Sequence, residues 1–110
     1  MERTYNKLVR DNIPAIIKNN GETPITRILT SEEYKQELEK KLYEEYQEVL
    51  EASGEDRIEE LADMLEIIKS LAKLENKDLD DVINIANQKN SKRGSFNDKI
   101  FLEKVITNNK

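Results

Sequence analysis

Five acidic residues in the middle of the chain are the side chains best suited to do chemistry. Glu44, Glu45 and Glu48 form a Glu-Glu-x-x-Glu motif, and Glu60 and Asp63 form a Glu-x-x-Asp motif. Offsets of three or four residues place side chains on one face of a helix. The chain has no Cys and no His, and carboxylate oxygens alone suit Mg²⁺ or Mn²⁺. The two motifs therefore indicate a divalent-metal site.

The first motif lies in a helix that we predict over residues 31–53. Glu45 falls inside the apolar stripe of this helix, Glu48 sits at its edge, and Glu44 lies further round. A helix whose acids served only solubility would carry all three on the opposite side. The stripe itself follows helical spacing and consists of Tyr34, Leu38, Leu42, Tyr46, Val49 and Ala52.

The second motif lies in a helix that we predict over residues 55–73. Its apolar positions cover more than half of the helical wheel, which predicts burial on two sides and a partner chain. Glu60 falls within this apolar arc and Asp63 borders it. The arc consists of Ile58, Leu61, Ala62, Met64, Leu65, Ile67, Ile68, Leu71 and Ala72.

A turn at Ser53-Gly54 would fold the two helices into an antiparallel hairpin. Glu45 then lies level with Asp63, and Glu48 with Glu60, because the residue numbers of each pair add to the same total. Four negative charges so close together must bind protons or a cation. We predict that the metal ligands are Glu45, Glu48, Glu60 and Asp63, and that the catalytic residues are Glu44 and Glu45.

A simpler interpretation is a solvated, acid-rich helix face, which is the commoner meaning of such runs. Since 23 of the 110 residues are acidic, three acids at fixed offsets arise about once by chance. The position of the acids on apolar faces and their matched levels favour the metal site.

The two acid motifs resemble the metal-binding signature of the all-α nucleoside triphosphate pyrophosphohydrolases of the MazG type. The Ala86-Asn87-Gln88-Lys89-x-x-x-Arg93 stretch is similar to the phosphate-contacting stretch of that group. The run from Tyr5 to Asp11 and the run from Lys92 to Phe96 resemble a compact single-domain branch, described as phosphoribosyl-ATP pyrophosphohydrolase-like.

The resemblance implies hydrolysis of a nucleoside triphosphate at the α–β phosphoanhydride bond with Mg²⁺, or with Mn²⁺ as a substitute. The products would be a nucleoside monophosphate and pyrophosphate, and the role would be house-cleaning of the nucleotide pool. Phosphoribosyl-ATP hydrolysis in histidine synthesis is an alternative, as is a non-catalytic helical interaction or nucleotide-sensing module. The substrate-binding residues implied are Asn87, Lys89, Lys92, Arg93, Lys7 and Arg10.

Spacing alone leaves the roles of these cations open. Lys89 and Arg93 extend an apolar line that begins at Leu79, so that one face of a third long helix begins apolar and ends cationic. Solvated side chains that complement the helix dipole are the alternative. For residues 1–10, an ordered arm packed on the core is the alternative to a substrate role.

Other catalytic classes are excluded by composition. Without His or Cys there is no Cys–His or Ser–His nucleophile, and the glycines at 21, 54 and 94 are too isolated for a phosphate-binding loop. The net charge of −5 disfavours nucleic-acid polymers and anionic membranes. No signal-peptide core or membrane-spanning run is present, so we expect a cytoplasmic protein.

The expected fold is mainly α, a single domain over residues 1–110 that forms an antiparallel helical bundle completed by a homodimer or homotetramer. A capping box at Thr30 and Glu33 starts the long helix, and Asp11 or Asn12 caps a short helix before it. Residues 25–29 are the best strand candidate, with residues 99–102 as the only plausible mate.

Overall fold

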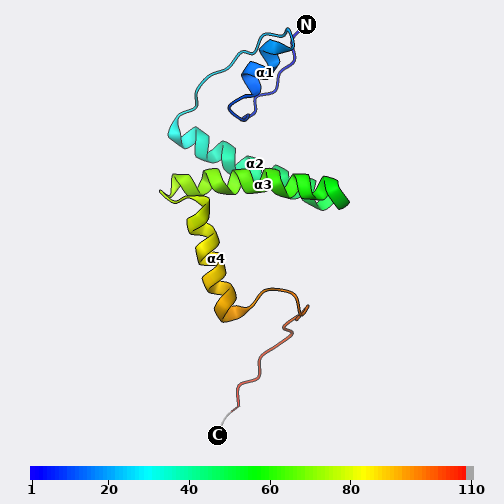
Figure 1. The fold of residues 1–110 in the computed structure, drawn as a ribbon, viewed down its shortest axis with the longest axis vertical. Helices are drawn as coiled ribbons and strands as arrows, with labels where there is room; N and C mark the ends of the chain where they lie inside the picture. Colours follow the sequence, from blue (N-terminus) through cyan, green and yellow to red (C-terminus); the bar gives the residue numbers. More distant parts are fainter. Residues whose placement is uncertain (109–110) are drawn as a thin grey trace. The chain divides into compact units, whose positions relative to one another are not determined.

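The computed structural model describes residues 1–108, which hold four helices and no strand (Figure 1). The chain divides into two compact units, one of residues 1–79 and one that begins at Asp80. No helix in the described part of the chain combines the length and the apolar character needed to cross a membrane. The helices are α1 (Ile13–Asn19), α2 (Ser31–Glu51), α3 (Gly54–Leu74) and α4 (Leu79–Arg93).

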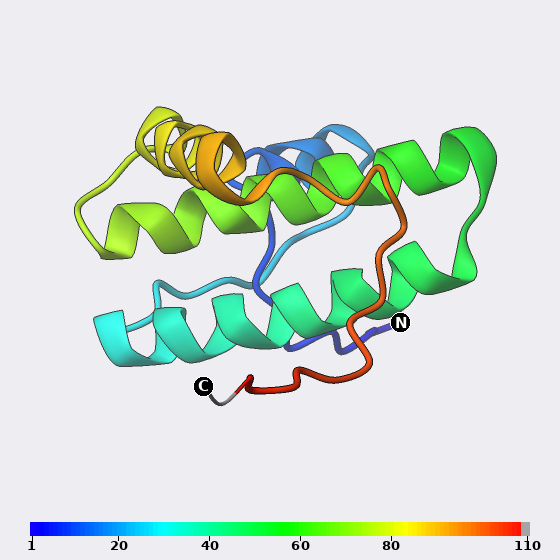
Figure 2. The ribbon, with the colours of Figure 1, turned by 90° about the horizontal axis from the view of Figure 1, so that it is seen from below.

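Helices α2 and α3 lie side by side and antiparallel, joined by a short turn (Figure 2). The predicted capping box begins α2, with Glu33 N–H donating to Thr30 Oγ1 at 3.2 Å and Thr30 N–H donating to Glu33 Oε1 at 3.1 Å. Gly54 follows the turn at φ +60°, a left-handed conformation that glycine adopts without strain. The sequence therefore predicted both helices to within two residues at each end.

The interior of the hairpin is small and aliphatic. Within residues 1–108 the buried apolar side chains are Leu38 and Val49 of α2 and Ile67 of α3. The expectation that α3 is buried on two sides is wrong for the single chain, since Ile58 is 65% exposed and Leu65 47% exposed. One antiparallel neighbour covers only one stripe of a helix.

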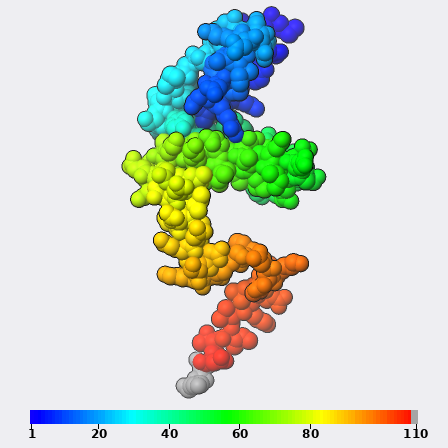
Figure 3. Space-filling model, viewed as in Figure 1, coloured from blue at the N-terminus to red at the C-terminus, as the bar shows by residue number. Residues whose placement is uncertain are grey.

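The N-terminal arm and α1 precede the hairpin, drawn in blue in Figure 3. Helix α1 follows Asn12 and has a proline in its first turn, as predicted, although the Asn12 side chain makes no capping hydrogen bond. Within residues 1–10 only Leu8 is even half-buried. The arm therefore contributes little to the buried interior of the described chain.

The predicted two-stranded element is absent from residues 1–108. Residues 25–29 and 99–102 are both irregular, and Ile25 and Ile28 are 93% and 95% exposed. Branched residues favour strands because their side chains pack on a half-buried sheet surface. An isolated ribbon offers little such surface, which is why two strands alone are marginal.

Helix α4 follows its sequence signals closely. Asp80 and Asp81 occupy its first turn and Lys92 and Arg93 its last, which suits the helix dipole at both ends. Gly94 ends the helix at φ +78°, with its N–H donating to the Asn90 carbonyl oxygen at 2.8 Å.

Candidate metal centre

Three of the four predicted ligands converge between α2 and α3. Glu45 on α2 and Glu60 and Asp63 on α3 each offer a carboxylate oxygen, and these oxygens lie within 4.8 Å of one another. All three residues are half-buried. We call these three residues the acid cluster. The predicted hairpin register thus brings together side chains that are 15 and 18 residues apart in the sequence.

Glu48, the fourth predicted ligand, is exposed and lies outside the group of three converging oxygens. Glu48 nevertheless contributes to the raised pKa values of both Glu45 and Glu60. Glu48 therefore stands at the solvent-exposed edge of the acid cluster.

The two glutamates of the acid cluster hold protons more tightly than ordinary glutamates do. Burial, followed by a hydrogen bond to Glu48, raises the pKa of Glu45. A hydrogen bond to Glu48, followed by burial, raises the pKa of Glu60 to about 7. Both causes disfavour the charged form of a carboxyl. Near neutral pH, repulsion within the cluster is thus relieved in part by bound protons.

Two oxygen atoms of the acid cluster have unmet bonding capacity. Oε2 of Glu45 and Oε2 of Glu60 are buried, and neither has a hydrogen-bond partner among the described residues. A buried polar atom without a partner is unfavourable. A Mg²⁺ ion binds oxygens at 2.0–2.1 Å and so holds them at most about 4.2 Å apart. At most one pair of the three oxygens can lie opposite across the ion, and the other pairs must approach to about 2.9 Å. Binding one hard divalent cation therefore requires the side chains to move closer together than the observed spacing of up to 4.8 Å.

One cationic side chain lies directly against the acid cluster. Arg10 Nη2 donates to Asp63 Oδ1 at 2.8 Å, and the two side chains are 61% and 46% exposed. The sequence predicted Arg10 as a substrate contact but gave no indication of this partner, which is 53 residues away. The ion pair brings the end of the N-terminal arm to the candidate metal site.

Glu44 and Lys7 occupy separate surroundings. Glu44 is half-buried on α2, beside Glu45 in sequence but outside the acid cluster. Lys7 lines a hollow of about 390 Å³ formed by the arm, the segment after α1 and the first turns of α2. This hollow, which Arg27 and Glu33 also line, was not predicted.

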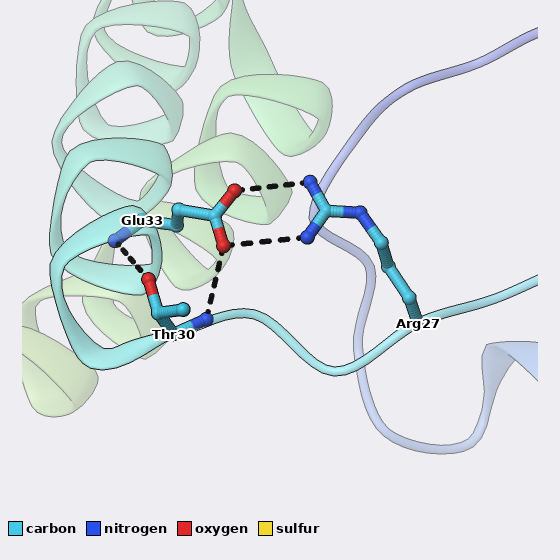
Figure 4. Close-up of polar contacts among 3 residues, drawn as sticks. All are labelled: Arg27, Thr30 and Glu33. Carbon is cyan, nitrogen blue, oxygen red and sulfur yellow. Dashed lines mark hydrogen bonds and ion pairs between the residues drawn. The ribbon is translucent and has the colours of Figure 1, made fainter.

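Glu33, at the start of α2, is an acid whose charge is fully satisfied (Figure 4). Arg27 donates to both of its carboxylate oxygens, at 3.3 Å and 3.0 Å, and Thr30 N–H donates to one of them. Arg27 and the Thr30 backbone together lower the pKa of Glu33 to about 2. The sequence predicted the Thr30 bonds but not Arg27.

The remaining predicted substrate residues lie on α4 and are all exposed: Asn87, Lys89, Lys92 and Arg93. Arg93 also lines a second hollow, of about 240 Å³, formed with the loop that follows α4. All four residues belong to the unit that begins at Asp80. Their assignment as phosphate contacts stays a prediction from the sequence.

Comparison with known proteins adds little to these observations. No family model matches the chain, and no solved structure matches it. An uncharacterized protein of Mycolicibacterium smegmatis is 44% identical over 50 residues, which are 46% of this chain. The match spans about half of that protein, 51% of its length, and its name assigns no activity.

Proposed function

We propose that this protein hydrolyses a nucleoside triphosphate at the α–β phosphoanhydride bond, with Mg²⁺ as cofactor, to a nucleoside monophosphate and pyrophosphate. The observation that carries the proposal is the acid cluster, where three carboxylate oxygens converge within 4.8 Å and two buried oxygens have no partner. The resemblance of the acid motifs to those of MazG-type enzymes supplies the reaction.

Glu45, Glu60 and Asp63 would hold the cation, and Glu48 at the exposed edge would complete the oxygen ligands. A divalent cation there supplies positive charge for phosphate oxygens and makes a nearby water molecule more acidic. An all-oxygen ligand set favours Mg²⁺, with Mn²⁺ as the natural substitute.

Other side chains of the protein would position the attacking water and the phosphate groups. Glu44, the neighbour of Glu45 in the sequence, would orient the attacking water or accept its proton. Arg10 already reaches the acid cluster, and its exposed guanidinium can leave Asp63 for a phosphate group, which carries more negative charge. Lys7 and the α4 residues Asn87, Lys89, Lys92 and Arg93 are further phosphate contacts on this proposal, by sequence resemblance.

House-cleaning of a cytoplasmic nucleotide pool is the role that such an activity would serve. Phosphoribosyl-ATP belongs to the same chemical class of substrate, because it also carries a triphosphate whose α–β bond can be cleaved. The choice between a standard nucleotide, a damaged one and phosphoribosyl-ATP depends on groups that bind the base and sugar, and a direct assay decides it.

The test is a pyrophosphate-release assay on a panel of standard nucleotides, oxidised nucleotides and phosphoribosyl-ATP, with Mg²⁺ and with EDTA. We expect turnover of at least one substrate with Mg²⁺ and none with EDTA. Glu60→Gln should abolish turnover, whereas Glu59→Gln, the exposed neighbour on α3, should not. Binding without turnover would indicate a nucleotide sensor, and neither binding nor turnover would indicate an interaction module.

A further inference from the structure

The segment that follows α4 places cationic side chains around an exposed aromatic ring. Phe96 is 97% exposed and lines the second hollow, of about 240 Å³, together with Arg93 and Lys99. All the lining residues belong to one stretch of the chain, residues 93–100. We call this stretch and the hollow that it forms the loop hollow.

The backbone of the stretch holds this arrangement. Gly94 has a φ of +78°, a left-handed conformation that ends α4 and turns the chain away from the helix. Lys99 N–H then donates to the Phe96 carbonyl oxygen at 3.3 Å, which closes a turn. One cation precedes Phe96 and one follows it, and the turn brings both to the same hollow.

The charge around the loop hollow is opposite in sign to that of the whole chain. Residues 89–99 contain four cations and one acid, Asp98, a net charge of +3, whereas the chain carries −5. Complementarity to the helix dipole explains the cations in the last turn of α4, Lys92 and Arg93. It does not explain Lys99, which lies beyond the helix, or the exposed ring between the cations. A ligand that combines negative charge with a flat apolar surface matches all of these groups.

We propose that the loop hollow binds the base of a nucleotide, which stacks on Phe96 while the surrounding cations contact the phosphate groups. Every base has a flat face that stacks on an aromatic ring, and a cationic groove with such a ring is a general means of binding nucleotides. The Asn97 amide, which also lines the hollow, offers both donors and an acceptor to the edge of a base. A hollow of about 240 Å³ is smaller than the pockets of drug-sized ligands, which begin near about 300 Å³. It therefore suits a single ring system with the phosphate groups outside.

This site rests on the proposed function in one respect, because it assigns the group that binds the base of the substrate. Its binding is nevertheless independent of the metal, since no residue of the acid cluster belongs to the loop hollow. The site also distinguishes substrate classes: a nucleotide makes the stacking contact, whereas a phosphate chain without a base contacts only the cations.

The first test is a fluorescence titration in EDTA, where no metal-dependent turnover takes place. The chain has no tryptophan, so Phe96→Trp places a single reporter in the loop hollow and keeps a stacking ring. ATP should quench its fluorescence saturably, and tripolyphosphate, which lacks the base, should not. Phe101→Trp is the matched control, because Phe101 is 86% exposed in the same unit but does not line the hollow. ATP should leave its fluorescence unchanged.

The second test is calorimetric titration of the wild type and of variants whose fold is confirmed by circular dichroism. Phe96→Ala should weaken ATP binding about tenfold and leave tripolyphosphate binding unchanged, whereas Phe101→Ala should change neither. Arg93→Gln should weaken the binding of both ligands, because it removes a phosphate contact, and added salt should weaken both as well.

The outcomes separate this site from the proposed reaction. A wild type that binds no ATP in EDTA, equal ATP binding by Phe96→Ala and the wild type, or equal quenching in the two tryptophan variants would overturn the site, even if Mg²⁺-dependent turnover is observed. Binding of ATP that depends on Phe96, without turnover in Mg²⁺, would support the site and overturn the hydrolytic function.

Discussion

Helix α2 carries two half-buried glutamates whose pKa values are shifted in opposite directions. At its first turn, Glu33 accepts hydrogen bonds from Arg27 and Thr30, and its pKa is lowered to about 2. Further along, Glu45 belongs to the acid cluster together with Glu60, whose pKa is raised to about 7. Glu45 and Glu60 each have a buried oxygen without a hydrogen-bond partner among the described residues. The first site is satisfied by groups of the protein itself, whereas the second has buried oxygens that no described group satisfies, and it is there that we propose a cation.

Removing a ligand from the acid cluster should have the largest effect on activity. We expect Glu45→Gln to lower kcat/KM at least about 100-fold, because a lost ligand removes several kcal/mol of transition-state stabilisation. Glu33→Gln should leave activity within a few fold, since Glu33 is bound to Arg27 and Thr30 at the start of α2. Steady-state kinetics of pyrophosphate release measures both. Equal losses in the two variants would mean that the two acid sites do not differ in function.

The same two substitutions should change thermal stability in opposite directions. In EDTA, Glu45→Gln should raise the Tm by several degrees, because it removes a repelling charge from the acid cluster. Glu33→Gln should lower the Tm, because the charge that Arg27 and the cap favour is lost. Thermal melts followed by circular dichroism test the pair. A lower Tm for Glu45→Gln would contradict the idea that burial beside other acids makes the charged form of Glu45 unfavourable.

The pH dependence of stability should separate the sites into two windows. The folded pKa of Glu60, about 7, exceeds its ordinary value of 4.5, so its contribution is complete below pH 4.5 and is lost as the pH rises through about 7. The folded pKa of Glu33, about 2, lies below 4.5, so its contribution is present above pH 4.5 and is lost as the pH falls through about 2.

Urea unfolding of the metal-free protein across these pH values measures both windows. Glu60→Gln should reduce the fall in the free energy of unfolding between pH 4.5 and 7. Glu33→Gln should reduce the fall in the free energy of unfolding at acid pH. Saturating Mg²⁺ should also remove the upper window, because the cation replaces the proton. If the free energy of unfolding of Glu60→Gln falls between pH 4.5 and 7 as much as that of the wild type, groups other than Glu60 cause the fall.

The smallest effect is expected at Arg10. Its ion pair with Asp63 joins side chains that are 61% and 46% exposed, and exposed pairs contribute little after solvent screening. Arg10→Ala should therefore tighten Mn²⁺ binding by no more than about fivefold without nucleotide, since the cation no longer competes with the guanidinium. It should also raise the KM for the nucleotide if Arg10 moves to a phosphate group. A variant with unchanged Mn²⁺ affinity and unchanged KM would leave Arg10 with no role at the site.

The sequence was sufficient wherever local signals decide the structure. The capping box at Thr30, the turn before Gly54 and the glycine after Arg93 placed the helix ends. Once those ends were known, the level rule for a hairpin predicted that Glu45 would meet Asp63. Helical periodicity and chain connectivity alone determine these features, and both can be read along the chain.

The sequence did not predict contacts between distant segments, or features that depend on what surrounds a residue in the fold. The pairing of Arg10 with Asp63 depends on the path of the chain around α1. The branched run at Ile25 predicted a strand, but strand propensity has no effect without a partner surface. Periodicity marked Ile58 as an interior residue, but Ile58 is 65% exposed, because a single antiparallel neighbour covers only one stripe of α3. Glu48 lies at the stripe edge, where a small rotation decides between ligand and surface residue.

Calorimetric titration with Mn²⁺ tests most directly whether the acid cluster is a metal site. We expect saturable binding at pH 7 by the wild type and by Glu33→Gln, and its loss in Glu60→Gln. Binding at pH 7 should release protons, seen by comparing buffers of different ionisation heat, and the release should shrink as the pH rises above about 7. A folded wild type that binds no Mn²⁺ would contradict the metal site. So would a Glu60→Gln variant that binds Mn²⁺ as tightly as the wild type and releases as many protons.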